Sequence, residues 1–412
     1  MLNIVNHKNI SFPRKILKNI AEQVPENLIG LDRQVFIGNS LKKITPEERM
    51  FLKRLFDTFL LFMKEKEASD IDIGGRGCNG KVWYRIYGEK KPEMEFGEFT
   101  LTETDVLCQS ILTEKQRDYL YSNRNLDFSY QILEDAERFR ADLYFDLDHL
   151  CLNMRYISNK IRPIKELGFH PNVLKVMSLN YVKQGLILVT GITGSGKSST
   201  LDSIISANNH TVNAHITIIG SPIETVHKPF KSIIRHREVG RDVLSFKEGV
   251  IQSLRQDPDI IVVGEMRDPE TIMAVLEITD SGHKVFSTLH TASAVESIDR
   301  IIGECPPIEQ ERVRNRLADV LTCVVSQKLV PDLSGKRVLA KEILLTTPSV
   351  KAAIKNNNTG EIYQMINESG RLGMITMEQD LLRLYKERKI SKENAVNYAN
   401  NKNRILELLR GI

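Results

Sequence analysis

Residues 191–198 carry the most specific chemical pattern of the chain, Gly-Ile-Thr-Gly-Ser-Gly-Lys-Ser, which matches GxxxxGK[ST]. Its glycines permit positive φ and let several backbone N–H groups converge on one phosphate group. The lysine then reaches the terminal phosphates, and the serine that follows can ligate Mg²⁺. The pattern therefore predicts a site for a nucleoside triphosphate. The residues expected to form it are Gly191, Thr193, Gly194, Ser195, Gly196, Lys197, Ser198 and Ser199.

The residues on either side of this loop predict the strand and the helix that must position it. Residues 185–190 form an uncharged, apolar run that is typical of a buried parallel strand. After the lysine, Leu201, Ile204 and Ile205 fall on one helical face. The alternative, a chance glycine turn with a solvated lysine, does not require a strand before it and a helix after it.

A second predicted strand lies within residues 259–268 and ends in an acid, Glu265. In a parallel sheet such a strand lies next to the phosphate-loop strand. Glu265 would then lie near Mg²⁺, as a metal ligand or as the group that orients or deprotonates the attacking water. The aspartate that usually ends such a strand is replaced by Gly264. The alternative is an ordinary buried strand followed by a surface glutamate.

A third predicted strand, within residues 282–291, delivers His290 at its end. In a doubly wound sheet a side chain at that end faces the ligand crevice. His290 could there sense the γ-phosphate by donating a hydrogen bond. A purely structural histidine is the alternative interpretation.

The composition indicates a soluble protein of two or three domains. The chain has 412 residues, of which 41% are hydrophobic and 27% are charged. Because 57 basic residues face 53 acidic ones, we expect no nucleic-acid partner. Five scattered cysteines form no CxxC pair, and neither a signal peptide nor a bilayer-spanning apolar run is present. We therefore expect a cytoplasmic protein that reaches a membrane only through partners.

The order of patterns along the chain predicts an α/β fold in several parts. Residues 1 to about 44 are weakly patterned and suggest an irregular extension or a short helical arm. A helix is expected from Thr45, with Pro46 in its first position and Glu48 completing a capping box. A strand-rich stretch then predicts an antiparallel sheet. From about residue 175 to 345 strands alternate with helices, as in a parallel nucleotide-binding sheet.

The phosphate loop, residues 263–268 and residues 287–291 together resemble the ATPase superfamily of type II and type IV secretion and of type IV pili. The resemblance is closest to its PilT-like pilus-retraction members. Further matching segments are residues 237–242, 254–259, 326–331 and 374–380. We expect five parts: an N-terminal extension (1–50), an α+β domain (51–165), a linker (166–175), a P-loop ATPase domain (176–345) and a C-terminal helical region (346–412). The resemblance implies that the α+β domain is PAS-like and that the ATPase domain is RecA-like.

The resemblance also implies ligands and partners. These are ATP and Mg²⁺, a homohexameric ring, and an inner-membrane platform protein through which ATP hydrolysis drives pilus retraction and twitching motility. In such relatives arginines of the N-terminal domain reach the nucleotide, and the matching positions are Arg140 and Arg155. A guanidinium suits this role because it stays charged and binds phosphate through two N–H groups. Without the resemblance both would be interpreted as surface or fold-supporting arginines.

One segment departs from the family. Its acidic box, Glu-Asp-Pro-Ile-Glu, reads Gly-Ser-Pro-Ile-Glu at residues 220–224, so only Glu224 keeps its carboxylate. Two interpretations follow: a motor in which Glu265 alone positions water, or an ATP-binding subunit that hardly hydrolyses ATP and acts beside an active paralogous ATPase. A nucleic-acid translocase is a third class that the charge balance opposes. Retraction, assembly, secretion and conjugation all remain open.

Overall fold

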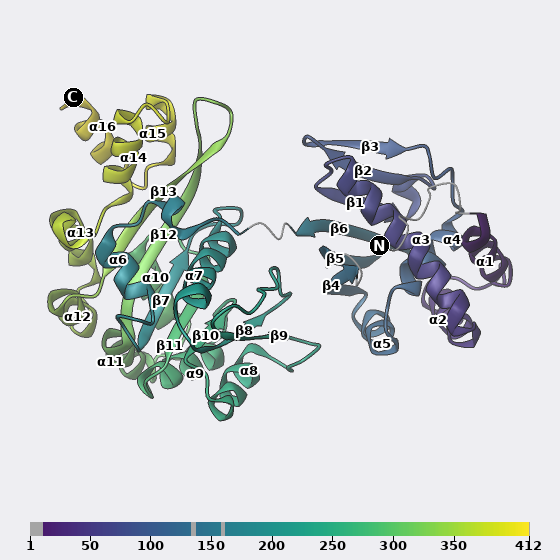
Figure 1. Cartoon of the computed structure of the whole chain (residues 1–412), viewed down its shortest axis with the longest axis horizontal. Helices are drawn as coiled ribbons and strands as arrows, with labels where there is room; N and C mark the ends of the chain where they lie inside the picture. Colours follow the sequence, from purple (N-terminus) through teal and green to yellow (C-terminus); the bar gives the residue numbers. More distant parts are fainter. Residues whose placement is uncertain (1–10, 133–136, 158–160, 412) are drawn as a thin grey trace. The chain divides into compact units, whose positions relative to one another are not determined.

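The structure is a computed structural model that describes residues 11–132, 137–157 and 161–411. The chain divides into two compact units, Met1–Asn159 and Lys160–Ile412, and each has its own sheet (Figure 1). The predicted ranges 1–50, 51–165 and 346–412 each include residues outside that description. The five-part division itself stays a prediction.

The N-terminal unit is built on a six-stranded antiparallel sheet with strand order β3-β2-β1-β6-β5-β4. Its strands are β1 (Asp70–Gly74), β2 (Val82–Ile86), β3 (Glu89–Glu93), β4 (Asn125–Ile132), β5 (Glu137–Asp146) and β6 (His149–Ile157). Its helices are α1 (Ser11–Glu22), α2 (Gly30–Lys43), α3 (Pro46–Glu65), α4 (Leu101–Ser110) and α5 (Glu114–Asn123). The capping box predicted at Thr45 is confirmed, since its hydroxyl accepts from the Glu48 N–H at 3.2 Å.

Helices α1 and α2 belong to the core of this unit. Leu17 and Ile37 are fully buried in the same apolar cluster as Phe56 and Phe59 of α3. The Arg14 guanidinium donates to the carbonyl of Phe96 at 2.7 Å. Within the described residues, 11–22 and 30–43 are thus packed helices, so the interpretation as an irregular extension is wrong there. Their local pattern is weak because the partners that complete their packing lie far along the chain.

The C-terminal unit is built on a seven-stranded sheet with strand order β13-β12-β7-β11-β10-β8-β9, parallel except for the β12–β13 pair. Its strands are β7 (Gly185–Thr190), β8 (His215–Gly220), β9 (Ile233–Glu238), β10 (Ile260–Val263), β11 (Lys284–Leu289), β12 (Leu321–Pro331) and β13 (Arg337–Leu345). Its helices before β12 are α6 (Pro171–Met177), α7 (Lys197–Thr211), α8 (Phe246–Ser253), α9 (Pro269–Asp280), α10 (Ala294–Gly303) and α11 (Gln310–Val320). After β13 follow α12 (Pro348–Lys355), α13 (Ile362–Glu368), α14 (Met377–Lys386), α15 (Lys392–Tyr398) and α16 (Lys402–Arg410).

The central strands of this sheet are buried on both faces, as their continuous apolar sequence requires. In β7, Leu186 and Leu188 belong to one apolar cluster, and Ile187 and Val189 belong to another. The three predicted strands and the α/β class are confirmed. Because β7, β8, β10 and β11 run parallel, the segments after their carboxyl ends emerge at one edge of the sheet. Among the described residues, no helix is long and apolar enough to cross a membrane.

The packing of α2 can be tested with two isoleucines. Ile37→Ala removes a side chain that is 0% exposed and should lower the free energy of unfolding of the N-terminal unit by about 2–5 kcal/mol. Ile29→Ala, at a position 74% exposed, is the matched control and should cost about 0.5 kcal/mol or less. Urea unfolding followed by the fluorescence of the single tryptophan, Trp83 in β2, reports on this unit. Equal midpoints for both variants would contradict the packing.

Candidate functional site

The phosphate loop lies between β7 and α7 and takes a shape that its glycines make possible. Gly191, Gly194 and Gly196 have φ values of 149°, 77° and 88°. A Cβ on Gly191 would lie 2.5 Å from the carbonyl oxygen of Gln327 and 2.4 Å from the Ser195 hydroxyl. Position 191 is therefore restricted to glycine by strand β12 as well as by its backbone conformation.

Lys197 is the first residue of α7 and is folded back onto the loop. Its ammonium group donates to the carbonyls of Gly191 at 2.8 Å and Ile192 at 3.3 Å. Burial lowers the pKa of Lys197, whereas the carboxylates of Glu265 and Glu224 oppose that shift. The two predicted acids thus lie within electrostatic reach of the lysine. Thr193, Ser198 and Ser199 are exposed to solvent at the mouth of the loop.

A residue that sequence reasoning did not single out, Gln327 of β12, holds the loop in place. Its side-chain amide donates to the carbonyl of Ser195 at 2.8 Å and accepts from the Thr200 hydroxyl of α7 at 3.0 Å. The side chain is buried. Gln327 lies in the family-matching segment 326–331, but nothing in that segment indicates its role, because its partners lie more than 120 residues away.

Glu265 and His290 meet at the carboxyl edge of the sheet, after β10 and β11. The nearest atoms, His290 Nε2 and Glu265 Oε1, are 3.5 Å apart. Burial and the nearby Lys197 lower the pKa of His290 below its usual 6.5, so the imidazole is neutral at pH 7. Arg267, a second residue missed at the sequence level, pairs with the other oxygen of Glu265 at 2.6 Å.

Residues 220–224, where the resemblance predicts the acidic box, begin at the end of β8. Gly220 ends β8 and lies beside Gly264, since a Cβ on Gly264 would be 3.4 Å from the Cα of Gly220. The backbone of residue 220 therefore lies next to Gly264, the residue that precedes Glu265. In the observed chain Ser221 is exposed and carries no carboxylate. On the neighbouring strand, Glu238 is paired in register with Gly220, and its carboxylate accepts from the Ile223 N–H at 3.2 Å.

Helix α7 also holds the segment that carries Glu224. Asp202 of α7 accepts hydrogen bonds from the Thr225 hydroxyl at 2.8 Å and lies 2.9 Å from Nε2 of His227. Glu224 itself is exposed. Two anchors directly after Glu224 thus fix its backbone to the helix that Lys197 begins. This contact was not foreseen from the sequence.

The two predicted arginines belong to the N-terminal unit. Arg140 of β5 and Arg155 of β6 are directly opposite each other in the sheet. Arg140 lies 3.7 Å from Asp127, and Arg155 donates through Nε to Asp70 at 2.7 Å. Both side chains are about half exposed or more. Their role toward a nucleotide stays a prediction.

The residues present could bind a magnesium ion only if phosphate oxygens of a bound nucleotide supplied further ligands. Among the described residues, no group of three or more histidine, cysteine, aspartate or glutamate side chains could hold a metal ion. Mg²⁺ commonly binds through one or two protein oxygens, several waters and substrate phosphates. The Ser198 hydroxyl and the Glu265 carboxylate supply such oxygens, and Ser198 lies in the first turn of α7.

The role of Gln327 leads to a prediction. Gln327→Met keeps the side-chain length but leaves the Ser195 carbonyl and the Thr200 hydroxyl without their buried partner. We expect the C-terminal unit to lose about 1–3 kcal/mol of unfolding free energy. Thermal unfolding followed by circular dichroism measures this loss, with Gln364→Met on the exposed face of α13 as the matched control. Identical melting curves for the two variants would show that Gln327 does not hold the loop.

Comparisons with known proteins identify the family to which the chain belongs. The model of the family described as type II/IV secretion system protein matches residues 47–408. The type IV pilus retraction ATPase PilT of Pseudomonas aeruginosa is 39% identical over 336 residues, which cover 82% of this chain and 95% of that protein.

Two solved structures are similar in fold. The crystal structure of the pilus retraction motor PilT with bound ADP has a TM-score of 0.77 at 36% identity and covers 85% of this chain and 98% of that one. The ATPase DotB of Legionella pneumophila has a TM-score of 0.73 at 25% identity and covers 87% and 95%. The expected fold class, a RecA-like P-loop domain with a smaller α+β N-terminal domain, is confirmed. The chain belongs to the type II/IV secretion system protein family and is similar to its PilT-like members.

Proposed function

We propose that this protein is a motor ATPase that binds ATP with Mg²⁺ and hydrolyses it to drive type IV pilus retraction or a related secretion process. The observation that carries the proposal is the arrangement of Lys197, Glu265 and His290. A lysine at a glycine-rich loop, an acid and a neutral histidine converge at the carboxyl ends of parallel strands of one sheet. The relatives named above as pilus-retraction ATPases support the same activity.

The phosphate loop supplies the binding step. Its backbone N–H groups and the N-terminus of α7 favour an anion. Lys197 would leave the carbonyls of Gly191 and Ile192 and move onto the phosphate oxygens. This exchange restores a full ionic partner to a buried ammonium group whose pKa is lowered by that burial. Bound Mg²⁺ would be held by Ser198 and would neutralise phosphate charge.

Hydrolysis would depend on Glu265. This carboxylate would orient the attacking water and accept its proton. It is paired with Arg267 in the structure, but that arginine side chain is 74% exposed. Such a pair contributes about 0–1 kcal/mol, so a bound nucleotide can displace it. His290, neutral at pH 7, can donate one hydrogen bond toward the γ-phosphate without adding a competing charge.

The proposed function also includes an oligomeric state and a membrane partner. We propose a homohexamer in which Arg140 and Arg155 reach a nucleotide and bind its phosphates bidentately. The partner would be an inner-membrane platform protein, which places the motor in the cytoplasm at the membrane face. No nucleic acid is part of the proposed function. The similarity to PilT favours retraction among the processes that the sequence left open.

A second function is favoured by Gly220 and Ser221, which stand where the family resemblance predicts two acids. The family resemblance places a carboxylate at the position of Gly220, which lies beside Gly264, the residue before Glu265. Without that carboxylate the chain would bind ATP and turn it over slowly, as a structural or regulatory subunit beside an active paralogous ATPase. General-base assistance is worth about 10²–10⁴-fold in rate, which sets the scale of the loss.

The proposal is tested by steady-state ATP turnover of the purified oligomer. Lys197→Ala should weaken ATP binding, and Glu265→Gln should keep binding but lower turnover by about 10²–10⁴-fold. If the wild-type protein binds ATP but turns it over no faster than Glu265→Gln, the motor is excluded and the weakly hydrolysing subunit is supported. If Lys197→Ala binds ATP as tightly as the wild type, the phosphate loop is not the site.

The missing carboxylate generates a second prediction. Gly220→Glu should raise kcat by about 10-fold or more if the lost acid limits hydrolysis. The substitution needs Ile223 to move and the chain at Pro222 to adjust, because a Cβ at position 220 would lie 2.8 Å from Cδ1 of Ile223 and 3.2 Å from the Pro222 carbonyl oxygen. Gly220→Gln has the same size without a carboxylate and should leave kcat unchanged. Equal kcat values for Gly220→Glu and the wild type would show that Glu265 alone suffices.

A further inference from the structure

A buried carboxylate of β13, Glu342, lies where two helices of the C-terminal unit begin. The residue is 2% exposed, and its Oε1 atom accepts a hydrogen bond from the Ala294 N–H at 2.7 Å. Ala294 is the first residue of α10. The N–H of Met377, the first residue of α14, donates to the same carboxylate. One carboxylate therefore accepts from free N–H groups at the starts of two helices, where the helix dipoles favour a negative charge.

The fold brings these helix starts to β13. Ile343, the residue after Glu342, exchanges two backbone hydrogen bonds with Ile375, at 2.8 and 3.2 Å, and this places the start of α14 beside the strand. On the other side, β12 pairs Ser326 with Glu342. The Ser326 hydroxyl lies 2.7 Å from that of Thr190, the last residue of β7. Backbone and side-chain contacts on both sides thus fix the position of Glu342.

Helix α10 connects this carboxylate to the segment that carries His290. The Arg300 side chain of α10 donates to the His290 carbonyl at 3.1 Å. The Glu296 side chain of the same helix accepts from the Ala292 N–H at 2.7 Å. The helix itself therefore holds the backbone that joins it to His290. A shift of the start of α10 would move this backbone, and with it the imidazole that lies 3.5 Å from Glu265.

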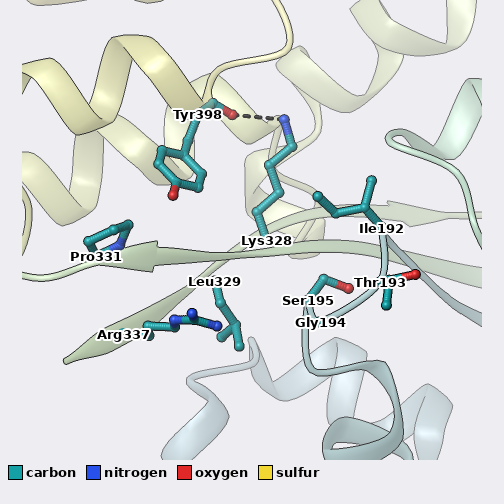
Figure 2. A pocket seen from close by; sticks show the side chains of 9 residues that line it. All are labelled: Ile192, Thr193, Gly194, Ser195, Lys328, Leu329, Pro331, Arg337 and Tyr398. Atoms are coloured by element: carbon teal, nitrogen blue, oxygen red, sulfur yellow. Dashed lines mark hydrogen bonds between the residues drawn. The ribbon is translucent and has the colours of Figure 1, made fainter. Parts of the chain in front are cut away.

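The C-terminal helices hold the same segment at a second point. Asn400, which follows α15, donates to the Ala292 carbonyl at 3.2 Å and accepts from the Lys328 ammonium group at 2.6 Å. Figure 2 shows that Lys328 also donates to the Tyr398 carbonyl, beside a cavity of about 220 Å³ that the phosphate loop lines as well. The segment before α10 is thus tied to the C-terminal helices through Asn400 as well as through Glu342.

Burial makes the ionised form of this side chain costly. It raises the pKa of Glu342 from the usual 4.5 to about 7. Among the described residues, the charged groups that act on it are Glu378 of α14, which adds to the shift, and Lys328 of β12, which opposes it together with the two N–H groups. The folded protein therefore binds more protons than the unfolded chain between pH 4.5 and about 7, so its stability decreases as the pH rises through this interval. A contribution to folding stability does not account for a carboxylate at this position.

We propose that Glu342 is a positioning residue, whose carboxylate fixes the start of α10 together with that of α14 and thereby places His290 relative to Glu265. The inference rests on the proposed nucleotide function, in which His290 donates to the γ-phosphate. The ionised form accepts from both N–H groups, whereas the protonated form brings a hydroxyl donor between them. The segment is therefore held more firmly above pH 7 than below it. Strand β13 and helix α14 then affect hydrolysis without touching the nucleotide.

Hydrogen–deuterium exchange of the nucleotide-free, full-length protein tests the positioning, read by mass spectrometry at residues 291–297. After correction for the intrinsic pH dependence of exchange, this segment of the wild type should exchange about 10-fold more slowly at pH 8 than at pH 6, because the ionised fraction of a group with a pKa of about 7 changes by that factor. Glu342→Gln keeps the size of the side chain but turns an NH₂ group toward an N–H donor. Its segment should exchange at both pH values as fast as the wild type does at pH 6.

The matched control is Glu361→Gln, at an exposed glutamate of the same unit, which should behave like the wild type. Exchange of the wild-type segment that does not depend on pH would overturn the inference, whether or not the variant folds. Protection of the segment in Glu342→Gln equal to that of the wild type at pH 8 would overturn it as well. So would a loss of protection throughout the C-terminal unit, since Glu342 would then only support the fold.

Steady-state turnover tests the consequence for His290. Glu342→Gln should lower kcat about 10-fold at pH 8 and leave the KM for ATP within about 2-fold of the wild-type value, because the phosphate loop is unchanged. The wild-type kcat should decrease as the pH falls through 7, and this decrease should be absent in Glu342→Gln. Equal kcat values at pH 8 would overturn the positioning role. A wild type that turns ATP over no faster than Glu265→Gln would instead exclude the motor, and the exchange measurement would still decide whether Glu342 fixes the segment.

Discussion

The contact between β12 and the phosphate loop is the constraint on which the rest of the site depends. Gln327 fixes the loop through the Ser195 carbonyl and the first turns of α7 through Thr200. Its backbone carbonyl leaves no room for a side chain at position 191. The glycines therefore do more than permit positive φ. They let a neighbouring strand close against the loop, and that strand continues into the wall of the cavity beside it.

Charged side chains gather where the parallel strands of the C-terminal sheet end. A buried lysine faces two carboxylates, and the histidine at the end of β11 is kept neutral by burial and by that lysine. In the proposed function, binding and hydrolysis depend on different residues of this edge. Binding is assigned to the loop and Lys197, whereas Gly220 and Ser221 carry no carboxylate that could act on water. The proposal therefore leaves the rate of hydrolysis to Glu265.

Local patterns predicted the strands, the loop and the positions of Glu265 and His290, because each depends on residues next to it in sequence. The capping box at Thr45 was predicted for the same reason. Gln327, Arg267 and the Asp202–Thr225 contact were not, since their roles come from partners that only the fold brings near. The N-terminal helices were underestimated because their apolar faces are completed by a distant core.

The most direct measurement is a crystal structure of the Glu265→Gln variant grown with ATP and Mg²⁺. We expect the phosphates on the backbone N–H groups of the loop and the Lys197 ammonium moved from the Gly191 carbonyl onto a phosphate oxygen. We also expect position 265 separated from Arg267 and within reach of a water at the γ-phosphate. ATP bound elsewhere, with Lys197 still on the Gly191 carbonyl, would contradict the proposed site.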